Sequence, residues 1–127
     1  MLPQENRLKH MKDFDILFKD GRFFAGKFVT AKIWKTEPGK YPRRKYTTDD
    51  LRIAFVVSVK VSKSAVKRNR TKRQMREVAR LLLKDGKLKT GFHISIMAKP
   101  GAVGAEYMEI EKDIKLVLER AGVARAD

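Results

Sequence analysis

The sequence contains no cysteine, which excludes disulfides, zinc fingers, other thiolate metal sites and cysteine nucleophiles together. No segment approaches the roughly 18 consecutive apolar residues of a membrane span. Residues 1–22 are charged throughout and have no apolar core of the length found in signal peptides. These absences favour a reducing compartment, and we expect a cytoplasmic protein that has no membrane partner.

Motifs for chemistry by the polypeptide itself are missing as well. Neither the phosphate-binding loop G-x-x-x-x-G-K-[ST] nor the dinucleotide fingerprint G-x-G-x-x-G occurs. The acidic pairs Asp13/Asp15 and Asp49/Asp50 have no second cluster of His, Asp or Glu at metal-ligand or acid–base spacing. We interpret Asp49 and Asp50 as solvated loop residues and His93 as a half-buried strand residue. The sequence therefore predicts no catalytic residue and no metal site.

Positive charge is what the chain has in excess. Thirty Lys and Arg stand against fifteen Asp and Glu, and the formal net charge of +15 exceeds what solubility needs. Residues 60–80 contain nine basic side chains and a single acid, Glu77. A solvated helix face normally mixes both signs at four-residue spacing, so this segment indicates a polyanionic partner, most commonly nucleic acid. Arg forks grip phosphate, and Asn69 between Arg68 and Arg70 can reach a sugar hydroxyl or base edge, a mixture that suits structured RNA.

Hydrophobic periodicity and composition predict an α+β fold and a single RNA-binding domain over residues 1–127. The expected helices are residues 13–19, 65–84 and 107–121, and the expected strands are residues 23–35, 51–60 and 92–97. Turn residues without periodicity make residues 36–50 an expected exposed loop, and we expect a frayed tail over residues 122–127.

The segment 65–84 separates into two faces at about 100° per residue. Ser64 is the expected N-cap, and Asp85-Gly86 is the expected end. The face expected in the core contains Thr71, Met75, Val78 and Leu82. The opposite face contains Asn69, Arg73, Arg76 and Arg80.

Phe14 and Phe18 lie one helical turn apart and therefore share a face of the first helix. Both can be buried anchors of the core, or they can form a half-exposed edge on which single-stranded bases stack. Composition leaves both interpretations open.

Three segments together resemble the bacterial ribonuclease P protein component, a small basic subunit that assists a catalytic RNA in removing the 5′ leader of precursor tRNA. The strongest match is residues 65–77, which contain the Arg-Asn-Arg signature at positions 68–70. The other two are Arg7-Leu8-Lys9 followed by Asp13-Phe14, Phe18-Lys19 and Gly21, and Ala98-Lys99-Pro100. Their order and spacing match across nearly the whole chain.

The resemblance implies an α-β-β-β-α-β-α sandwich with an uncommon left-handed βαβ crossover around the signature helix. It also implies two RNA-contacting regions. The residues expected to face the catalytic RNA are Lys67, Arg68, Asn69, Arg70, Lys72, Arg73 and Arg76. The residues expected to bind the leader, in a cleft between this helix and the sheet, are Phe14, Phe18, Ser58 and Lys60. The Phe pair thereby gains a functional interpretation.

The family's chemistry implies a division of labour between protein and RNA. Phosphodiester hydrolysis is assigned to Mg²⁺ ions bound mainly by the RNA, and the protein alone is expected to be inactive. The expected partners are the catalytic RNA and precursor tRNA, without an obligate protein partner. The chain departs from the family at Lys63, where Gly is common, at Ala31, where some relatives place a cleft aromatic, and in the longer segment 36–50.

Three rival functions are compatible with parts of the pattern. A ribosomal-protein-like RNA binder needs the basic face but not the exposed Phe pair. A DNA-binding protein that places residues 65–84 in a major groove predicts a helix-turn-helix and a dimer. A stand-alone enzyme on a related left-handed fold is disfavoured because the phosphate-binding loop is missing.

Overall fold

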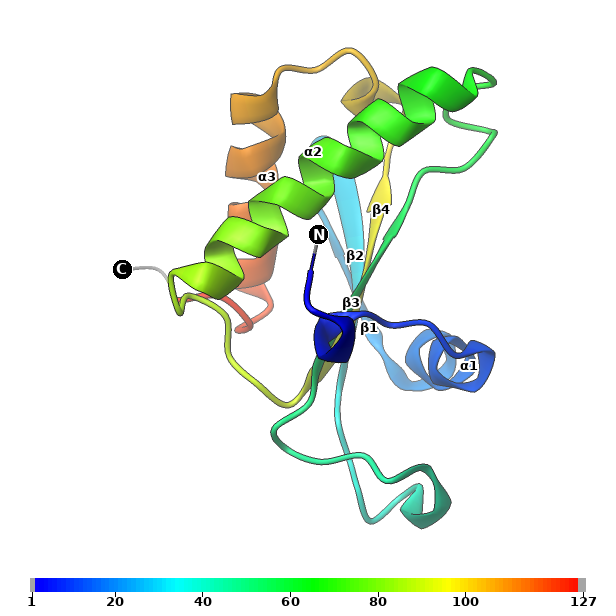
Figure 1. Ribbon diagram of the computed structural model, residues 1–127, viewed down its shortest axis with the longest axis vertical. Coiled ribbons are helices and arrows are strands. Elements are labelled where there is room, and N and C mark those ends of the chain that lie inside the picture. The colour runs from blue at the N-terminus through cyan, green and yellow to red at the C-terminus, as the bar shows by residue number, and fades with distance from the viewer. Residues whose placement is uncertain (1, 126–127) are drawn as a thin grey trace.

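The computed structural model describes residues 2–125 of the chain (Figure 1). The helices are α1 (Met11–Asp20), α2 (Ala65–Lys84) and α3 (Tyr107–Arg120), and the strands are β1 (Arg22–Ala25), β2 (Val29–Lys35), β3 (Leu51–Val56) and β4 (Phe92–Ala98). Short 3₁₀ turns occur at Gln4–Asn6, Pro42–Arg44 and Pro100–Ala102. The α-β-β-β-α-β-α order implied by the resemblance is confirmed.

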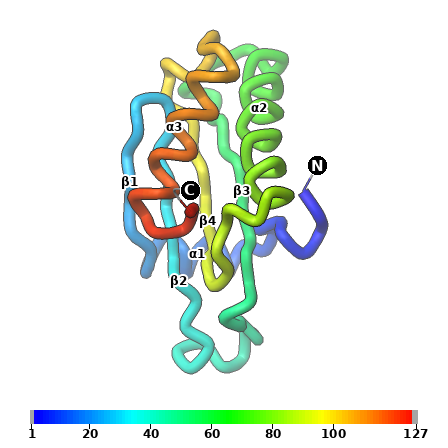
Figure 2. Tube along the Cα trace, turned by 90° about the vertical axis from the view of Figure 1, so that its left-hand side faces the viewer, coloured from blue at the N-terminus to red at the C-terminus, as the bar shows by residue number. Residues whose placement is uncertain are grey.

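The four strands form one open sheet in the order β1-β2-β4-β3. β2 is antiparallel to both β1 and β4, whereas β3 and β4 are parallel and are connected through α2. With the strands pointing up and the helices in front, β4 lies to the left of β3, so the β3-α2-β4 crossover is left-handed (Figure 2). This arrangement leaves β3 at one edge of the sheet, beneath α2.

The two faces of the sheet are covered unequally. α2 and α3 pack on one face, where Ala31, Ile53 and Ile94 belong to the main core with the buried stripes of both helices. α1 packs on the other face, in a smaller cluster around Leu17 and Trp34. α1 is short, so part of this second face stays open to solvent.

The helix predictions for α2 and α3 are confirmed at nearly every position. The Ser64 hydroxyl accepts a hydrogen bond from the Lys67 N–H, which satisfies one of the free donors at the start of α2. α2 ends before Gly86, whose φ of +67° favours glycine. All four residues of the predicted core stripe of α2 are buried, as are Ile110, Ile114, Val117 and Leu118 of α3.

The prediction of one strand over residues 23–35 is wrong, because this segment is a hairpin of β1 and β2. The Asp113 carboxylate of α3 accepts hydrogen bonds of 2.8–3.0 Å from the N–H groups of Lys27, Phe28 and Val29. A Cβ at Gly26 would lie 2.5 Å from the same carboxylate, so any larger residue there would displace the carboxylate from the turn. The turn therefore depends on a residue more than eighty positions away, which strand periodicity cannot show.

Three other expectations need correction. β3 ends at Val56, so Ser58 and Lys60 lie in the turn that follows the strand rather than on it. His93 is fully buried rather than half-buried. The tail is not frayed at Val123 and Ala124, which are buried, and Ala124 pairs with Leu88; residues 126–127 lie outside the described part of the chain.

The segment 36–50 is a loop, as predicted, but part of it is packed against the protein. Tyr46 is buried, and its ring lies 5.2 Å from the Trp34 ring in an edge-to-face arrangement. Thr36 is buried as well, where its hydroxyl donates to the Thr47 carbonyl oxygen. The expectation of an exposed loop therefore holds for its tip but is wrong at these two positions.

Candidate nucleic-acid interface

The first half of α2 presents a group of cations that form no ion pair within residues 2–125. Asn69, Arg70 and Arg73 are exposed, and their side chains make no hydrogen bond or ion pair within residues 2–125. Near the end of the polar stripe, Arg80 instead forms two hydrogen bonds of 2.6 and 2.9 Å with Glu77. These hydrogen bonds hold the pKa of Glu77 below its usual value. Arg80 is thus neutralised, and the signature end of the helix carries the free cations.

Arg68 differs from its neighbours in the signature. Its guanidinium donates a 2.9 Å hydrogen bond to the Ser62 carbonyl oxygen, and the side chain is only half-exposed. This bond ties the start of α2 to the preceding turn. Arg68 therefore shapes the loop before the helix, in addition to any contact it makes with a partner.

The seven predicted residues of the signature helix do not form one flat surface. Lys67 and Arg70 line a cavity of about 210 Å³ that α2 forms with the loop at residues 103–105. Lys72 and Arg76 lie on the opposite flank of α2 and line a second cavity of about 350 Å³. The cationic surface therefore wraps around the helix, and its two flanks face different neighbours.

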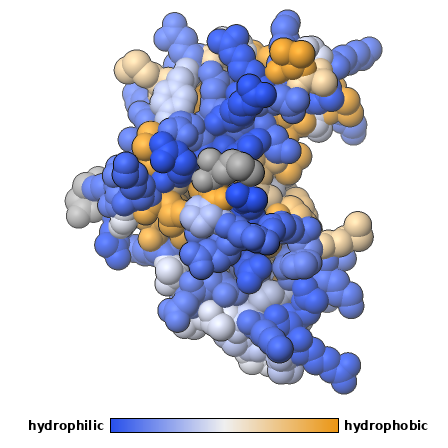
Figure 3. All heavy atoms as spheres, in the orientation of Figure 1, coloured by the Kyte–Doolittle hydropathy of each residue, from blue (hydrophilic) through white to orange (hydrophobic). Residues whose placement is uncertain are grey.

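The second cavity, which we call the edge groove, runs along the outer edge of β3, the edge that does not pair with β4. Its lining residues are Leu2, Arg7, Leu8, Lys9, Phe14, Ile53, Ala54, Phe55, Val56, Lys72 and Arg76. The N-terminal segment forms one wall because the Leu8 N–H donates to the Ile53 carbonyl oxygen and Arg7 pairs with Ile53. Apolar residues show in the middle of this face, framed by hydrophilic ones (Figure 3). An apolar floor between cationic walls suits bases and phosphates of a single strand.

The structure brings only one of the four predicted leader residues into the edge groove. Phe14 is half-buried, packs against the α1 cluster and lines the groove. Phe18 is 43% exposed and lies one turn further along α1, outside the groove lining. Ser58 and Lys60 are exposed in the turn after β3 and do not line it either.

Residues that the sequence pattern missed complete the groove. Arg7 and Lys9 add positive charge to a lining that also contains Lys72 and Arg76, and Phe55 of the main core adds an aromatic residue from the sheet face opposite to the α1 cluster that holds Phe14. The Arg7-Leu8-Lys9 triplet was a signal for the first two, since it alternates around a buried Leu8. Phe55 gave no such signal, because its alternation with Ile53 indicates only a core position.

The position of Ala31 on β2 shows whether this residue can take part in a contact between β2 and the leader. Its side chain is completely buried in the main core, on the sheet face covered by α2 and α3. Its neighbour Lys32 lies on the opposite face, in one row with Phe23, Ser95 and Ala54 across the sheet. The Lys32 ammonium lies 3.9 Å from the centroid of the Phe23 ring, which is 61% exposed. Ala31 therefore faces the covered side of the sheet, and Lys32 on the other side is only 8% exposed, with its ammonium against the Phe23 ring.

The acidic pair Asp49/Asp50 is not uniformly solvated. Asp49 is exposed, but the Asp50 carboxylate accepts hydrogen bonds from Thr47 and lies 3.4 Å from the buried His93 ring. Burial lowers the pKa of His93 below its usual value, although the Asp50 carboxylate acts in the opposite direction. Residues 2–125 contain no group of three or more His, Asp or Glu positioned to hold a metal ion.

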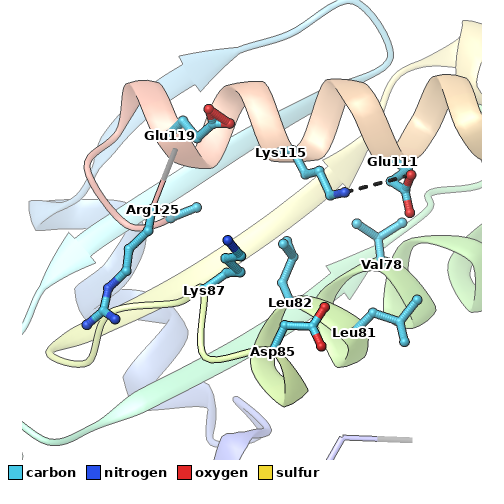
Figure 4. Close-up of a pocket in the computed structure, with 10 residues that line it drawn as sticks. Val78, Leu81, Leu82, Asp85, Lys87, Glu111, Lys115, Glu119 and Arg125 are labelled. Carbon is cyan, nitrogen blue, oxygen red and sulfur yellow. Dashed lines mark ion pairs between the residues drawn. The ribbon is translucent and has the colours of Figure 1, made fainter. Parts of the chain in front are cut away.

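A further cavity of about 320 Å³ lies between the end of α2, α3 and the C-terminal segment (Figure 4). Its rim carries three acids, Asp85, Glu111 and Glu119, and three bases, Lys87, Lys115 and Arg125, and Lys115 lies 3.8 Å from Glu111. Because these opposite charges balance, the cavity lacks the excess of positive charge that lines the two cavities along the first half of α2. None of the helices within residues 2–125 combines the length and the hydrophobicity of a membrane span.

The fold and the interface define a small basic α+β protein with a left-handed crossover and a cationic groove beside a sheet edge. The chain belongs to the ribonuclease P family, whose family model, described as Ribonuclease P, matches residues 2–122. The ribonuclease P protein component of a Pseudanabaena species is 37% identical over 97% of both chains. That of Clostridioides difficile is 33% identical over 94% of this chain and 96% of its own.

Solved structures show the same fold at lower identity. The Staphylococcus aureus RNase P protein superposes with a TM-score of 0.75 at 23% identity, over 94% of this chain and 98% of its own. The RNase P protein from Thermotoga maritima gives a TM-score of 0.71 at 23% identity, over 90% of this chain and 96% of its own. The predicted family and fold class are both confirmed.

Proposed function

We propose that this chain is the protein subunit of a ribonuclease P, which binds the catalytic RNA and the 5′ leader of precursor tRNA in the cytoplasm. The edge groove carries the proposal, because it joins Phe14 to Lys72 and Arg76 of the signature helix around an apolar floor. Such a groove accepts a single strand by stacking and phosphate contacts, without requiring a particular sequence.

The two flanks of α2 divide the work in this proposal. Lys67, Asn69, Arg70 and Arg73 face solvent and the 103–105 loop, where a folded catalytic RNA can dock its phosphates. Lys72 and Arg76 turn toward the edge groove and contact the leader instead of only the catalytic RNA. A strand held in the groove therefore lies against the same helix that binds the catalytic RNA.

Hydrolysis itself belongs to the RNA in this proposal. Mg²⁺ ions bound mainly by the RNA would activate the attacking water and stabilise the leaving oxygen. The chain's net charge of +15 lowers the electrostatic cost of bringing two polyanions together and replaces part of their cation atmosphere. Precursor tRNA gains more than mature tRNA because only the precursor has a leader to occupy the groove.

A ribosomal-protein-like role is the second candidate, since it needs only the cationic surface of α2. A purely structural RNA binder has no use for a groove in which an aromatic ring and two cations of the helix converge. The two functions differ in one measurable property, which is discrimination between precursor and mature tRNA.

Reconstitution with a ribonuclease P RNA and precursor tRNA at low Mg²⁺ tests the proposal. We expect the protein to be inactive alone, to lower the Mg²⁺ needed for cleavage and to bind precursor more tightly than mature tRNA. Lys72→Ala with Arg76→Ala should reduce this discrimination, whereas Lys112→Ala on the exposed face of α3 and Asp49→Asn should not. RNA-free protein that cut precursor tRNA, or equal binding of precursor and product by the wild type, would refute the proposal.

A further inference from the structure

The loop at residues 36–50 is anchored to α1 by two carboxylates. Asp20 accepts a hydrogen bond of 2.5 Å from the Tyr41 hydroxyl and lies 3.2 Å from the Lys40 ammonium. Asp13, about two helical turns before Asp20 on α1, accepts hydrogen bonds from Arg44 at 2.8 Å and from Tyr46 at 2.6 Å. Two acids of a strongly basic protein are thus used to fix one loop in place.

Aromatic packing holds the same loop from behind. The Trp34 ring of β2 meets the Tyr41 ring at 5.9 Å and the Tyr46 ring at 5.2 Å, both edge to face. The loop projects from the end of the sheet opposite the start of α2 (Figure 1). Its tip is therefore preorganised, and a ligand that binds there loses little free energy in ordering it.

Between this loop and α1 lies a cavity of about 500 Å³, which is lined by residues that the edge groove does not use. Its apolar lining comes from Ile16, Tyr41 and Pro42. Its cationic lining comes from Lys12, Lys40, Arg43 and Arg44, and Asp15 is its one acid. Lys12 and Arg43 are exposed and form no ion pair within residues 2–125, so their charges are available to a ligand.

The chemistry of this lining selects among polyanions. Phosphates of a double helix would meet the cations, but its paired bases would not reach the apolar floor. An unpaired nucleotide satisfies both parts, since its base can cover Tyr41 and Pro42 while the flanking phosphates reach Lys12 and Arg43. The Asp15 carboxylate can accept a hydrogen bond from a ribose 2′-hydroxyl, which DNA lacks.

We propose that the cavity between α1 and the 36–50 loop binds one unpaired RNA nucleotide, as a second RNA site separate from the edge groove. The proposal deepens the proposed function and depends on it, because RNA is the ligand in both. The segment 36–50, whose role the family resemblance left open, then has a function.

Titration of ¹⁵N-labelled protein with a single-stranded hexauridylate tests the site by NMR. We expect amide shift changes at Lys12, Tyr41 and Arg43 that saturate independently of those at Arg73. Lys12→Ala with Arg43→Ala should weaken the hexauridylate affinity reported by the amides around the cavity about tenfold at low salt. The affinity reported by the Arg73 amide should not change. The matched control Lys89→Ala with Lys112→Ala removes the same charge from exposed positions elsewhere. It should change neither the affinity reported by the cavity amides nor that reported by the Arg73 amide.

The outcomes separate this proposal from the function on which it depends. Shifts at Arg73 without shifts around the cavity would overturn the second site and leave RNA binding by α2 intact. Equal shifts with a blunt RNA duplex would overturn the unpaired-nucleotide assignment, and absence of shifts at both sets would overturn both proposals. The Lys12/Arg43 variant is then tested for binding to precursor tRNA, mature tRNA and the catalytic RNA, and the RNA for which it loses affinity is the one that supplies the nucleotide. No loss of affinity for any of the three would also refute the site.

Discussion

The Asp13 carboxylate of α1 accepts a 2.6 Å hydrogen bond from the Tyr46 hydroxyl, 33 residues further along the chain. Asp13 is only 2% exposed, and burial alone would raise its pKa. Hydrogen bonds from Arg44 and Tyr46 outweigh that effect and hold the pKa of Asp13 below its usual value. One carboxylate therefore joins the first helix to a loop that sequence patterns place at the surface.

Asp13→Asn should lower the free energy of unfolding at pH 7 by about 2 kcal/mol, because it removes a buried charge that Arg44 and Tyr46 require. The depressed pKa means that the carboxylate stabilises the protein above about pH 3.9, its unfolded pKa, and that this contribution fades as the pH falls through the folded pKa. The variant should therefore lose less stability than the wild type on acidification below pH 4. Urea unfolding at pH 7 and pH 3 measures both effects.

Asp15→Asn is the control for this experiment, since Asp15 is exposed on the same helix. An equal effect of both substitutions on stability would contradict the role assigned to the Asp13 network.

Asp113→Ala should destabilise the β1–β2 hairpin, because three N–H groups at residues 27–29 lose their acceptor. We expect a loss of about 3 kcal/mol, and hydrogen exchange should become faster at these three amides before it does so in α2. The neighbouring Lys112→Ala, at an exposed position, should leave both measurements near wild type. Unchanged exchange at the turn would show that the carboxylate does not hold the hairpin.

Single alanine substitutions of Phe14 and Phe18 should show whether each ring contributes to stability, to precursor binding or to both. Phe18→Ala should cost less than about 1 kcal/mol of stability because the ring is 43% exposed, whereas Phe14→Ala should cost about 2 kcal/mol. Each should weaken precursor binding by about 1–3 kcal/mol if its ring stacks on leader bases, with little change for mature tRNA. Titration of both tRNAs and thermal unfolding provide the two measurements.

The exposed Met108→Ala on α3 controls for loss of apolar surface. If Phe18→Ala binds precursor like this control, Phe18 is not part of the leader site.

Arg70→Ala with Arg73→Ala should weaken binding to the catalytic RNA and reduce the slope of log K against log salt by about two, one for each lost phosphate contact. Both side chains are exposed, so stability should not change. Arg68→Ala is expected to differ, because it also releases the Ser62 carbonyl and loosens the turn before α2. Filter binding over a range of salt concentrations measures the slope.

The Lys89→Ala/Lys112→Ala variant carries the same net charge and serves as the comparison. A salt slope that fell equally in both variants would assign the effect to overall charge rather than to α2.

Some elements of this fold could be predicted from the sequence, and others could not. The stripes of α2 and α3 and the Ser64 cap were predictable because helix geometry relates residues three and four positions apart. The strand prediction for residues 23–35 failed because the turn at Gly26 depends on Asp113, which no local period reveals. The seven signature residues were identified as cationic, but their split between two flanks follows from what packs beside α2.

Local patterns in this chain thus specify its helices and two of its strands, and net charge indicates the kind of partner. The composition of the edge groove depends on the N-terminal segment pairing with β3, which brings Arg7 and Lys9 into a lining that also contains Lys72 and Arg76. The anchored 36–50 loop likewise depends on Asp13 and Asp20 meeting Arg44 and Tyr41 across two elements. Such contacts join residues far apart in the chain, and their geometry is set by how the sheet and helices pack rather than by any short-range rule.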